Sequence, residues 1–171
     1  MAGNTIVNKK VSSGGFRSSL VEPITDYESI NRMSEILANQ SERNYLLFVI
    51  GINIGLRVSD YAGLTVGFFR EACKKGVIEL IPSKTDKREE DEYGNLVGTF
   101  KVVRLPIPKE LKETIENYIE FRDDSEYMFP SRKGGTPIRR ETIWTILNDA
   151  AAEAGLNINI GCHSMRKTFG Y

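Results

Sequence analysis

A nearly continuous apolar stretch constrains the fold of this chain more than any other feature. From Leu46 to Ile54 the sequence is apolar on almost every side of a helix, and Ser41 precedes the stretch as a capping residue. A helix without a polar face is buried inside a protein, and no apolar run here is long enough to cross a bilayer. We therefore expect a central helix over residues 42–54, ended by Gly55 in the left-handed conformation.

Helical spacing of apolar residues predicts a mainly helical domain around this central helix. We expect helical segments at five further places: residues 26–38, behind capping-box spacing at residues 25–28; a short turn capped by Ser59 and reaching Leu64; a helix after Pro108; residues 140–154; and a last helix that starts near His163. Three aromatic residues, Phe121, Trp144 and Tyr171, are expected in the core.

Two β-rich runs predict a small antiparallel sheet. They cover residues 77–81 and 100–105, and a very polar connector containing Gly94 and Gly98 joins them. We expect two strands with a long, mobile connection between them. The fold class is therefore α+β and mainly helical, with one domain over residues 22–171 behind a flexible, polar arm over residues 1–21.

Charge and composition limit the possible partners. Lys plus Arg and Asp plus Glu both number 23, so the formal charge is zero, whereas DNA-binding proteins usually have a basic excess. One His and two Cys cannot supply a convincing metal site, so we expect no metal and no cofactor. Without a secretory signal or membrane span we expect a cytoplasmic protein, with Cys73 and Cys162 as reduced thiols.

Four basic or polar residues stand at junctions between the expected elements, namely Arg57, Lys84, His163 and Arg166. His163 and Arg166 are three apart, so they share one face at the start of a helix. Any of these residues taken alone is more often a solvated charge or a cap. Together they form a set of donors suited to a phosphate whose negative charge grows in a transition state, without a metal ion.

The local sequence around these residues resembles the catalytic domain of tyrosine recombinases, the phage integrase family. The matching segments are residues 55–60 (Gly-Leu-Arg-Val-Ser-Asp), 83–85 (Ser-Lys-Thr) and 163–169 (His-Ser-Met-Arg-Lys-Thr-Phe), with family-like connectors at 105–108, 128–131 and 137–140. The first and last of these segments, residues 55–60 and 163–169, are the two conserved boxes. Each box is short, but both stand in the family's order with Lys84 between them. The resemblance runs from about residue 22 to the end of the sequence.

The resemblance implies a role for each residue. Arg57 and Arg166 would grip the oxygens of the scissile phosphate, and His163 would orient the phosphate and assist proton movement. Lys84 would protonate the leaving 5′ oxygen once a mobile hairpin closes onto DNA, and Lys87 is the alternative lysine. Asp60 would support the neighbouring cations.

The family's nucleophilic tyrosine follows the second box by a few tens of residues, whereas this sequence ends five residues after Arg166. Tyr171 does not match the nucleophile's position. We therefore expect a fragment that is inactive alone, from a parent that forms a 3′-phosphotyrosine link and acts on double-stranded DNA as a homotetramer. Two alternatives remain open: a type IB topoisomerase, and a non-catalytic DNA-binding or regulatory module.

Further DNA contacts are expected from basic residues outside the two boxes. They are Lys87 and Arg88 in the connector, and Arg132, Lys133, Arg139 and Arg140 around the start of the helix expected over residues 140–154. Each of them fits a solvated surface charge equally well. The acidic run at residues 89–92 opposes DNA binding in the middle of the hairpin.

Overall fold

The predicted central helix is present as α2 (Glu42–Ile54) in the computed structural model, which describes residues 20–171. Its buried side chains include Leu46, Phe48 and Ile50, none of them measurably exposed to solvent. The Ser41 hydroxyl accepts a hydrogen bond from the Asn44 amide at 3.2 Å. Gly55 ends the helix at φ +68°, the left-handed conformation expected of it.

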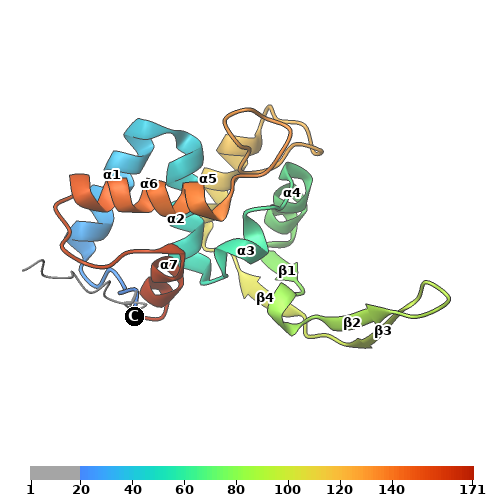
Figure 1. Ribbon diagram of the computed structural model, residues 1–171. Helices are drawn as coiled ribbons and strands as arrows, with labels where there is room; N and C mark the ends of the chain where they lie inside the picture. The colour runs from blue at the N-terminus through green and yellow to red at the C-terminus, as the bar shows by residue number, and fades with distance from the viewer. Residues whose placement is uncertain (1–19) are drawn as a thin grey trace, which may run out of the picture.

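In chain order the other helices are α1 (Tyr27–Gln40), α3 (Val58–Tyr61), α4 (Val66–Lys75), α5 (Lys109–Ile119), α6 (Arg140–Glu153) and α7 (Cys162–Phe169), with a 3-10 turn η1 (Ser83–Thr85) between strands. Among them, α1, α5 and α7 pack directly against α2, whereas α4 lies beside α5 and the strand β1, Val77–Leu80 (Figure 1). The fold class is confirmed as mainly helical with small antiparallel sheets.

The described strands form two separate ladders rather than the one ladder expected. β1 (Val77–Leu80) pairs with β4 (Val103–Pro106), and β2 (Lys87–Glu90) pairs with β3 (Leu96–Thr99), both antiparallel. The connector is therefore an ordered hairpin, and the second expected strand starts at 103 rather than 100. The Asp91 carboxylate accepts the Tyr93 and Asn95 amides and so closes its turn.

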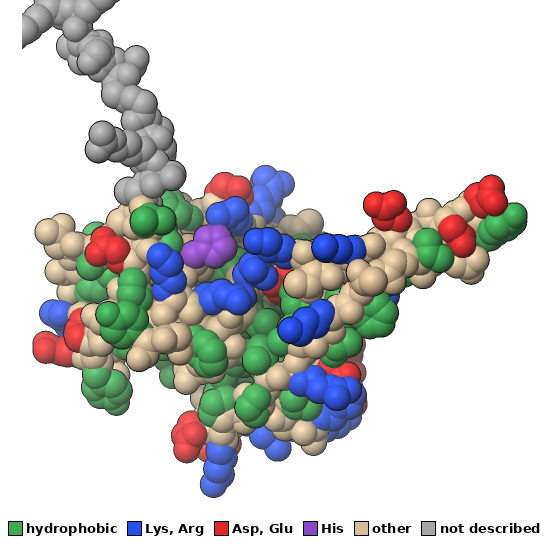
Figure 2. All heavy atoms as spheres, turned by 90° about the horizontal axis from the view of Figure 1, so that it is seen from below, with side chains coloured by type: hydrophobic (Ala, Val, Ile, Leu, Met, Phe, Trp, Pro, Cys, Tyr) green, Lys and Arg blue, Asp and Glu red, His purple; other side chains and the backbone are tan. Residues whose placement is uncertain are grey.

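The hairpin of β2 and β3 projects from the body of the molecule (Figure 1), and no residue within either strand is fully buried. The space-filling view shows acidic and apolar side chains along it (Figure 2). Its exposed apolar residues include Tyr93, Leu96 and Val97. This arm takes no part in the core that supports the other elements.

Several details of the helices differ from the sequence-based predictions. Helix α4 was not predicted, although Thr65 caps its start through the Phe68 amide and Gly76 ends it at φ +68°. The cap of α1 is Asp26, whose carboxylate accepts the Ser29 amide at 2.7 Å. The predicted cap at Ser59 is also wrong, because α3 begins at Val58 and its N-cap residue is Arg57, two residues earlier.

The three aromatic residues assigned to the core lie at the surface. Phe121 is 92% exposed, Trp144 is 52% exposed and Tyr171 is 84% exposed. Phe121 falls just past the end of α5, so the apolar spacing of that helix no longer applies to it. Trp144 follows the buried Ile143 directly, and successive residues of a helix point in different directions.

Helix α7 packs closely on α2 because α2 has glycines at two positions four residues apart. A Cβ atom at Gly51 would lie 2.6 Å from the Met165 sulfur, and one at Gly55 would lie 2.2 Å from the Phe169 ring. The buried Tyr61 hydroxyl joins the two helices, because it donates to the Leu47 carbonyl at 3.0 Å and lies 3.9 Å from the Met165 sulfur. The position of α7 is thus fixed by close contacts with α2 and α3.

Nearly all of the predicted arm over residues 1–21 lies outside the described residues. Within the part that the structure describes, the Glu22 amide donates to the Asn159 carbonyl at 2.9 Å, and Lys167 donates to the Val21 carbonyl at 2.8 Å. No helix among residues 20–171 has the length and hydropathy of a membrane span.

Candidate functional site

Arg57 lies at the junction between the central helix and α3. The left-handed Gly55 turns the chain out of α2, and Arg57 then occupies the N-cap position of α3. Its guanidinium lies 3.8 Å from the Asp60 carboxylate, and its side chain is 27% exposed. The backbone at the end of the buried helix α2 therefore places the partly exposed Arg57 guanidinium at the surface.

Asp60 also holds the turn that carries Lys84. Its Oδ1 accepts hydrogen bonds from the Ser83 hydroxyl at 2.8 Å and the Ser83 amide at 3.1 Å. Only 1% of the Asp60 side chain is exposed, and its Oδ2 has no hydrogen-bond donor, with the Arg57 guanidinium as its ionic neighbour. One carboxylate thus connects the first arginine to the lysine turn.

His163 and Arg166 lie in α7, three residues apart, as predicted. Between them Ser164 and Met165 are buried, and the Ser164 hydroxyl accepts the Gly161 amide at 3.0 Å to order the start of the helix. His163 and Arg166 are exposed and face away from the core. The close packing of α7 on α2 fixes the backbone that carries them.

The four predicted residues meet at two hollows that share Arg57, Lys84 and His163. The first, of about 300 Å³, is also lined by Arg140 and Cys162. The second is also lined by Arg166 and Lys167, and no carboxylate lines either one. In the space-filling view the single histidine lies among Lys and Arg side chains (Figure 2). Such a set of donors suits an anion with several oxygens.

The surroundings of His163 favour the neutral form of its imidazole. Burial lowers the pKa of its imidazole, and the charges of Arg140, Arg57, Arg166 and Lys167 lower it further. A neutral imidazole has one N–H to donate and one nitrogen that can accept a proton. At neutral pH the residue can therefore orient a phosphate oxygen or move a proton, in addition to the fixed charges of the arginines.

The two predicted contacts in the connector do not reach these hollows. Lys87 is exposed at the start of β2 and lines neither of them. Arg88 donates to both oxygens of Asp86, at 2.8 and 2.6 Å, and lies 4.6 Å above the Phe100 ring. This pair lowers the pKa of Asp86 to about 2. Arg88 therefore has an internal partner at the base of the hairpin.

The remaining basic residues divide between two places. Arg140 lines the first hollow beside His163, whereas Arg132, Lys133 and Arg139 line a separate hollow on the other side of the start of α6. The sequence grouped Arg140 with these three residues, and the structure places its side chain at the first hollow instead. Sequence reasoning gave Ser83 no role of its own, because its contact with Asp60 depends on tertiary packing.

No group of three or more His, Cys, Asp or Glu residues that could hold a metal ion occurs between residues 20 and 171. Cys73 and Cys162 are both free and buried. Burial raises the pKa of both thiols, that of Cys73 to about 11. These thiols remain protonated at neutral pH, so they are poor nucleophiles.

Comparison with known proteins agrees with this geometry. Residues 24–171 match the family described as the phage integrase family. The chain belongs to the phage integrase family. A Bacillus subtilis member, named "Probable integrase/recombinase YoeC", is 35% identical over 152 residues, which cover 89% of this chain and 74% of that protein. The resemblance seen in the sequence is thereby confirmed.

More distant relatives are longer than the Bacillus subtilis protein. "Tyrosine recombinase XerA" of Pyrococcus furiosus is 26% identical over 83% of this chain, but the matched part is only 44% of its own length. Among solved structures, a XerA recombinase has a TM-score of 0.63 at 19% identity and a lambda integrase bound to DNA has 0.60 at 16%. The matches cover 86% and 90% of this chain, and 48% and 51% of those chains. These structures share the catalytic-domain fold.

Proposed function

We propose that this chain binds duplex DNA through the hollows around Arg57 and holds a phosphate for site-specific cleavage and rejoining. The observation that carries the proposal is the convergence of Arg57, Lys84, His163 and Arg166 at one surface from three separate elements. Solved relatives described as bound to DNA, among them lambda integrase and the Tn1549 transposon integrase, support duplex DNA as the partner.

The proposed reaction is a transesterification at a DNA phosphate. Arg57 and Arg166 stabilise the negative charge that grows on the non-bridging oxygens, as donors placed before the reaction begins. Lys84 protonates the leaving 5′ oxygen, and it already lines the hollow through the contact of Ser83 with Asp60. Fixed cations supply the charge stabilisation, so the step we propose needs no metal ion.

The nucleophile in this proposal comes from outside residues 20–171. No described tyrosine lines either hollow around Arg57. Tyr171 lies beyond the end of α7, and its side chain is directed to solvent. We propose that the complete protein supplies a tyrosine that forms a 3′-phosphotyrosine link, and that four copies exchange strands between two DNA sites in the cytoplasm.

A suicide DNA duplex, nicked so that a cleaved strand diffuses away, tests this proposal. We expect the chain to bind the duplex and to form no covalent protein–DNA adduct, whereas Arg57→Gln and Arg166→Gln should each bind it less tightly. An adduct mapped to Tyr171 would contradict the assignment of the nucleophile. Binding that is unchanged by either arginine substitution would contradict the site itself.

The gene beyond codon 171 provides a second test. A downstream His or Trp followed by Tyr, added to the chain, should convert binding into adduct formation on the same suicide duplex. A stop codon at that point would favour the non-catalytic DNA-binding module instead. A relaxation assay on supercoiled DNA separates a topoisomerase, which relaxes it as a monomer, from a recombinase that needs paired sites.

A further inference from the structure

The segment over residues 20–24, which we call the strap, passes α7 before the chain enters α1 (Figure 1). Its first two residues, Leu20 and Val21, line the second of the two hollows around Arg57, whose volume is about 480 Å³. Its last residue, Ile24, contacts Thr168 of α7 although 144 positions separate them in sequence. The strap is therefore part of the wall of the candidate site.

Two side chains in the last turn of α7 hold the strap. The Ile24 amide donates to the Thr168 hydroxyl at 2.9 Å, and Lys167 Nζ donates to the Val21 carbonyl at 2.8 Å. The Thr168 hydroxyl also donates to the Ser164 carbonyl at 2.9 Å, so it joins the strap to the backbone of the helix. Ile24 is 2% exposed, and a hydrogen bond at a buried position is costly to lose.

The strap also pairs with the loop that leads into α7. The Glu22 amide donates to the Asn159 carbonyl at 2.9 Å, and the Asn159 amide donates to the Glu22 carboxylate at 3.1 Å. The Asn159 side-chain amide donates to the Leu20 carbonyl at 3.3 Å. The strap thus contacts both the entry and the last turn of the same helix.

Val21 packs on Gly161, the residue directly before α7. A Cβ atom at Gly161 would lie 2.9 Å from Val21 Cγ1 and 3.8 Å from Trp144 Cδ1. Gly161 has a φ of −160°, an extended conformation that any residue can adopt. The glycine is therefore needed for the close approach of Val21 and not for its backbone conformation.

Helix α7 has eight residues, and a helix of this length is unstable by itself in water. Its position therefore depends on contacts with other segments. Helix α2 approaches the side chains of Met165 and Phe169, whereas the strap contacts Gly161 at the start and Lys167 and Thr168 at the end. The two sets of contacts are made by different residues of α7.

We propose that the strap is a positioning element of the phosphate site, which holds α7, and with it His163 and Arg166, in the orientation that a DNA phosphate requires. Thr168 and Lys167 are its positioning residues, so the charge of Lys167 is used to hold the strap although it lines the hollow. This inference rests on the proposed function, because the phosphate is the reason that α7 needs a fixed orientation.

Alkylation of cysteine by iodoacetamide measures opening of the strap. The sequence has two cysteines, Cys162 directly after Gly161 and Cys73 in α4, and both are free and buried. A buried thiol reacts only while its surroundings are open, so each rate reports local opening at that cysteine or unfolding of the whole chain. Peptide mass spectrometry separates the two rates.

Thr168→Val removes the acceptor of the Ile24 amide and keeps the shape of the side chain. We expect Cys162 to react about two- to tenfold faster, the factor that the loss of one hydrogen bond gives, while the rate at Cys73 stays unchanged. Thr168→Ser retains the hydroxyl and should react like the unmodified chain. Equal acceleration at both cysteines would report general destabilisation and would overturn the proposal.

A steric pair of variants tests the same strap without removing a hydrogen bond. Gly161→Ala places a methyl group against Val21, so we expect faster alkylation of Cys162. Val21→Ala removes the colliding atom, and the double variant should react more slowly than Gly161→Ala alone. A double variant that reacts as fast as Gly161→Ala would show that Val21 does not hold the start of α7, and would overturn the proposal.

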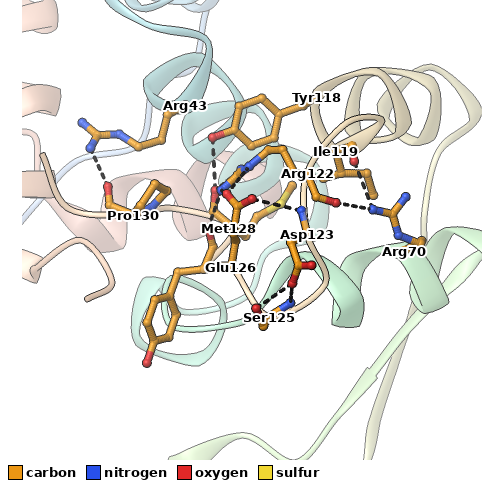
Figure 3. A network of polar contacts seen from close by, with 11 residues as sticks. Arg43, Arg70, Tyr118, Ile119, Arg122, Asp123, Ser125, Glu126, Met128 and Pro130 are labelled. Carbon is orange, nitrogen blue, oxygen red and sulfur yellow. Dashed lines mark hydrogen bonds and ion pairs between the residues drawn. The ribbon is translucent and has the colours of Figure 1, made fainter. Parts of the chain in front are cut away.

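Tyr118→Phe is the matched control for the loss of a hydrogen bond. The Tyr118 hydroxyl donates to the Met128 carbonyl at 3.2 Å, in a network that Arg122 completes on α5 and the loop after it (Figure 3). This substitution removes one tertiary hydrogen bond and leaves the contacts of the strap in place. Acceleration at Cys162 that is no larger for Thr168→Val than for Tyr118→Phe would contradict the proposal.

The pKa of His163 and the affinity for the suicide duplex test the link to the site. Thr168→Val changes no charge, so a pKa raised toward 6.5 would report that His163 has moved away from the burial and the cations that lower it. We expect this rise together with weaker duplex binding. Selective labelling of Cys162 with an unchanged pKa and affinity would overturn the positioning role. Duplex binding unchanged by Arg57→Gln would contradict the proposed function instead, whatever the labelling shows.

Discussion

Asp60 connects two of the residues for which we propose a role in phosphate binding, Arg57 and Lys84, through one carboxylate. It accepts two hydrogen bonds from Ser83, beside Lys84, and lies 3.8 Å from the Arg57 guanidinium. Its charge therefore sets both the direction of the arginine and the position of the lysine turn. A residue expected only as a support is the link between the first box and the hairpin.

Replacing Asp60 with alanine should destabilise the protein and weaken DNA binding together. Hydrogen bonds to a charged group contribute about 1.5–3 kcal/mol, and the Asp60 side chain is almost fully buried, so we expect a loss of that size in the free energy of unfolding. Urea denaturation measures it. Glu79→Ala, which removes a half-exposed ion pair with Arg104, is the control and should cost less than about 1 kcal/mol. A loss no larger than that of the control would contradict this role.

His163 gives a direct measure of the field in the site, because it is the only histidine of the sequence and its ring signals are unambiguous in an NMR spectrum. We expect a pKa below 6.5, since burial and four nearby cations disfavour the charged ring. Arg140→Gln removes the neighbouring charge that lowers this pKa most and should therefore raise it. Arg139→Gln is the control, because its side chain lines the other hollow; an equal shift for both would show that the effect is not local.

The same pKa shift has a consequence for stability. Because the folded-state pKa of His163 lies below that of the unfolded chain, the unfolded state binds more protons between the two values. The stability contributed by the neutral ring is complete above about pH 6.5 and is lost as the pH falls through that window. Binding of a phosphate should raise the pKa, because an anion favours the charged ring.

At the scale of elements, the contact between α2 and α7 decides whether the site exists. The glycines of α2 allow α7 to approach so closely that a methyl group at Gly51 would collide with Met165. Sequence reasoning identified Gly55 from its place at a helix end, but it gave no role to Gly51. A glycine inside an apolar helix has no local signal, because its role is set by a helix more than a hundred residues away.

Gly51→Ala should therefore destabilise the protein although alanine favours helices. The gain in helix propensity is about 0.5–1 kcal/mol, whereas overpacking a core costs about 1–3 kcal/mol. We expect a net loss of stability in thermal unfolding and weaker DNA binding, since α7 carries His163 and Arg166. Gly63→Ala is the matched control, because a Cβ atom there meets open space. Equal melting temperatures for the two variants would show that α7 can shift without cost.

Elements with strong local signals were predicted well, and those set by pairing were not. The buried helix, its Ser41 cap and its Gly55 end follow from periodicity and capping alone. The hairpin of β2 and β3 was expected as a loop, because its polar residues hide the pairing of residues 87–90 with 96–99. Phe121 and Trp144 were misplaced because spacing alone does not fix where a helix ends or which side it buries.

For the whole molecule, a net charge of zero conceals an uneven distribution. The three hollows described above are lined by cations without a carboxylate, whereas acidic residues gather on the projecting hairpin at residues 89–92. A sum over the sequence cannot report this separation, because it depends on which segments the fold brings together. The boxes named the site residues, and only the tertiary structure separated Arg139 from Arg140.

The packing of the last helix on the central one also orders events in time. Tyr61 and Met165, which touch in the core, are 104 positions apart. During translation α2 and α3 leave the ribosome long before α7, and residues this far apart meet only once both are available. A partly synthesised chain thus exposes Arg57 without its partners His163 and Arg166. The hollows around Arg57 can therefore form only when synthesis has passed α7, because His163 lines both of them.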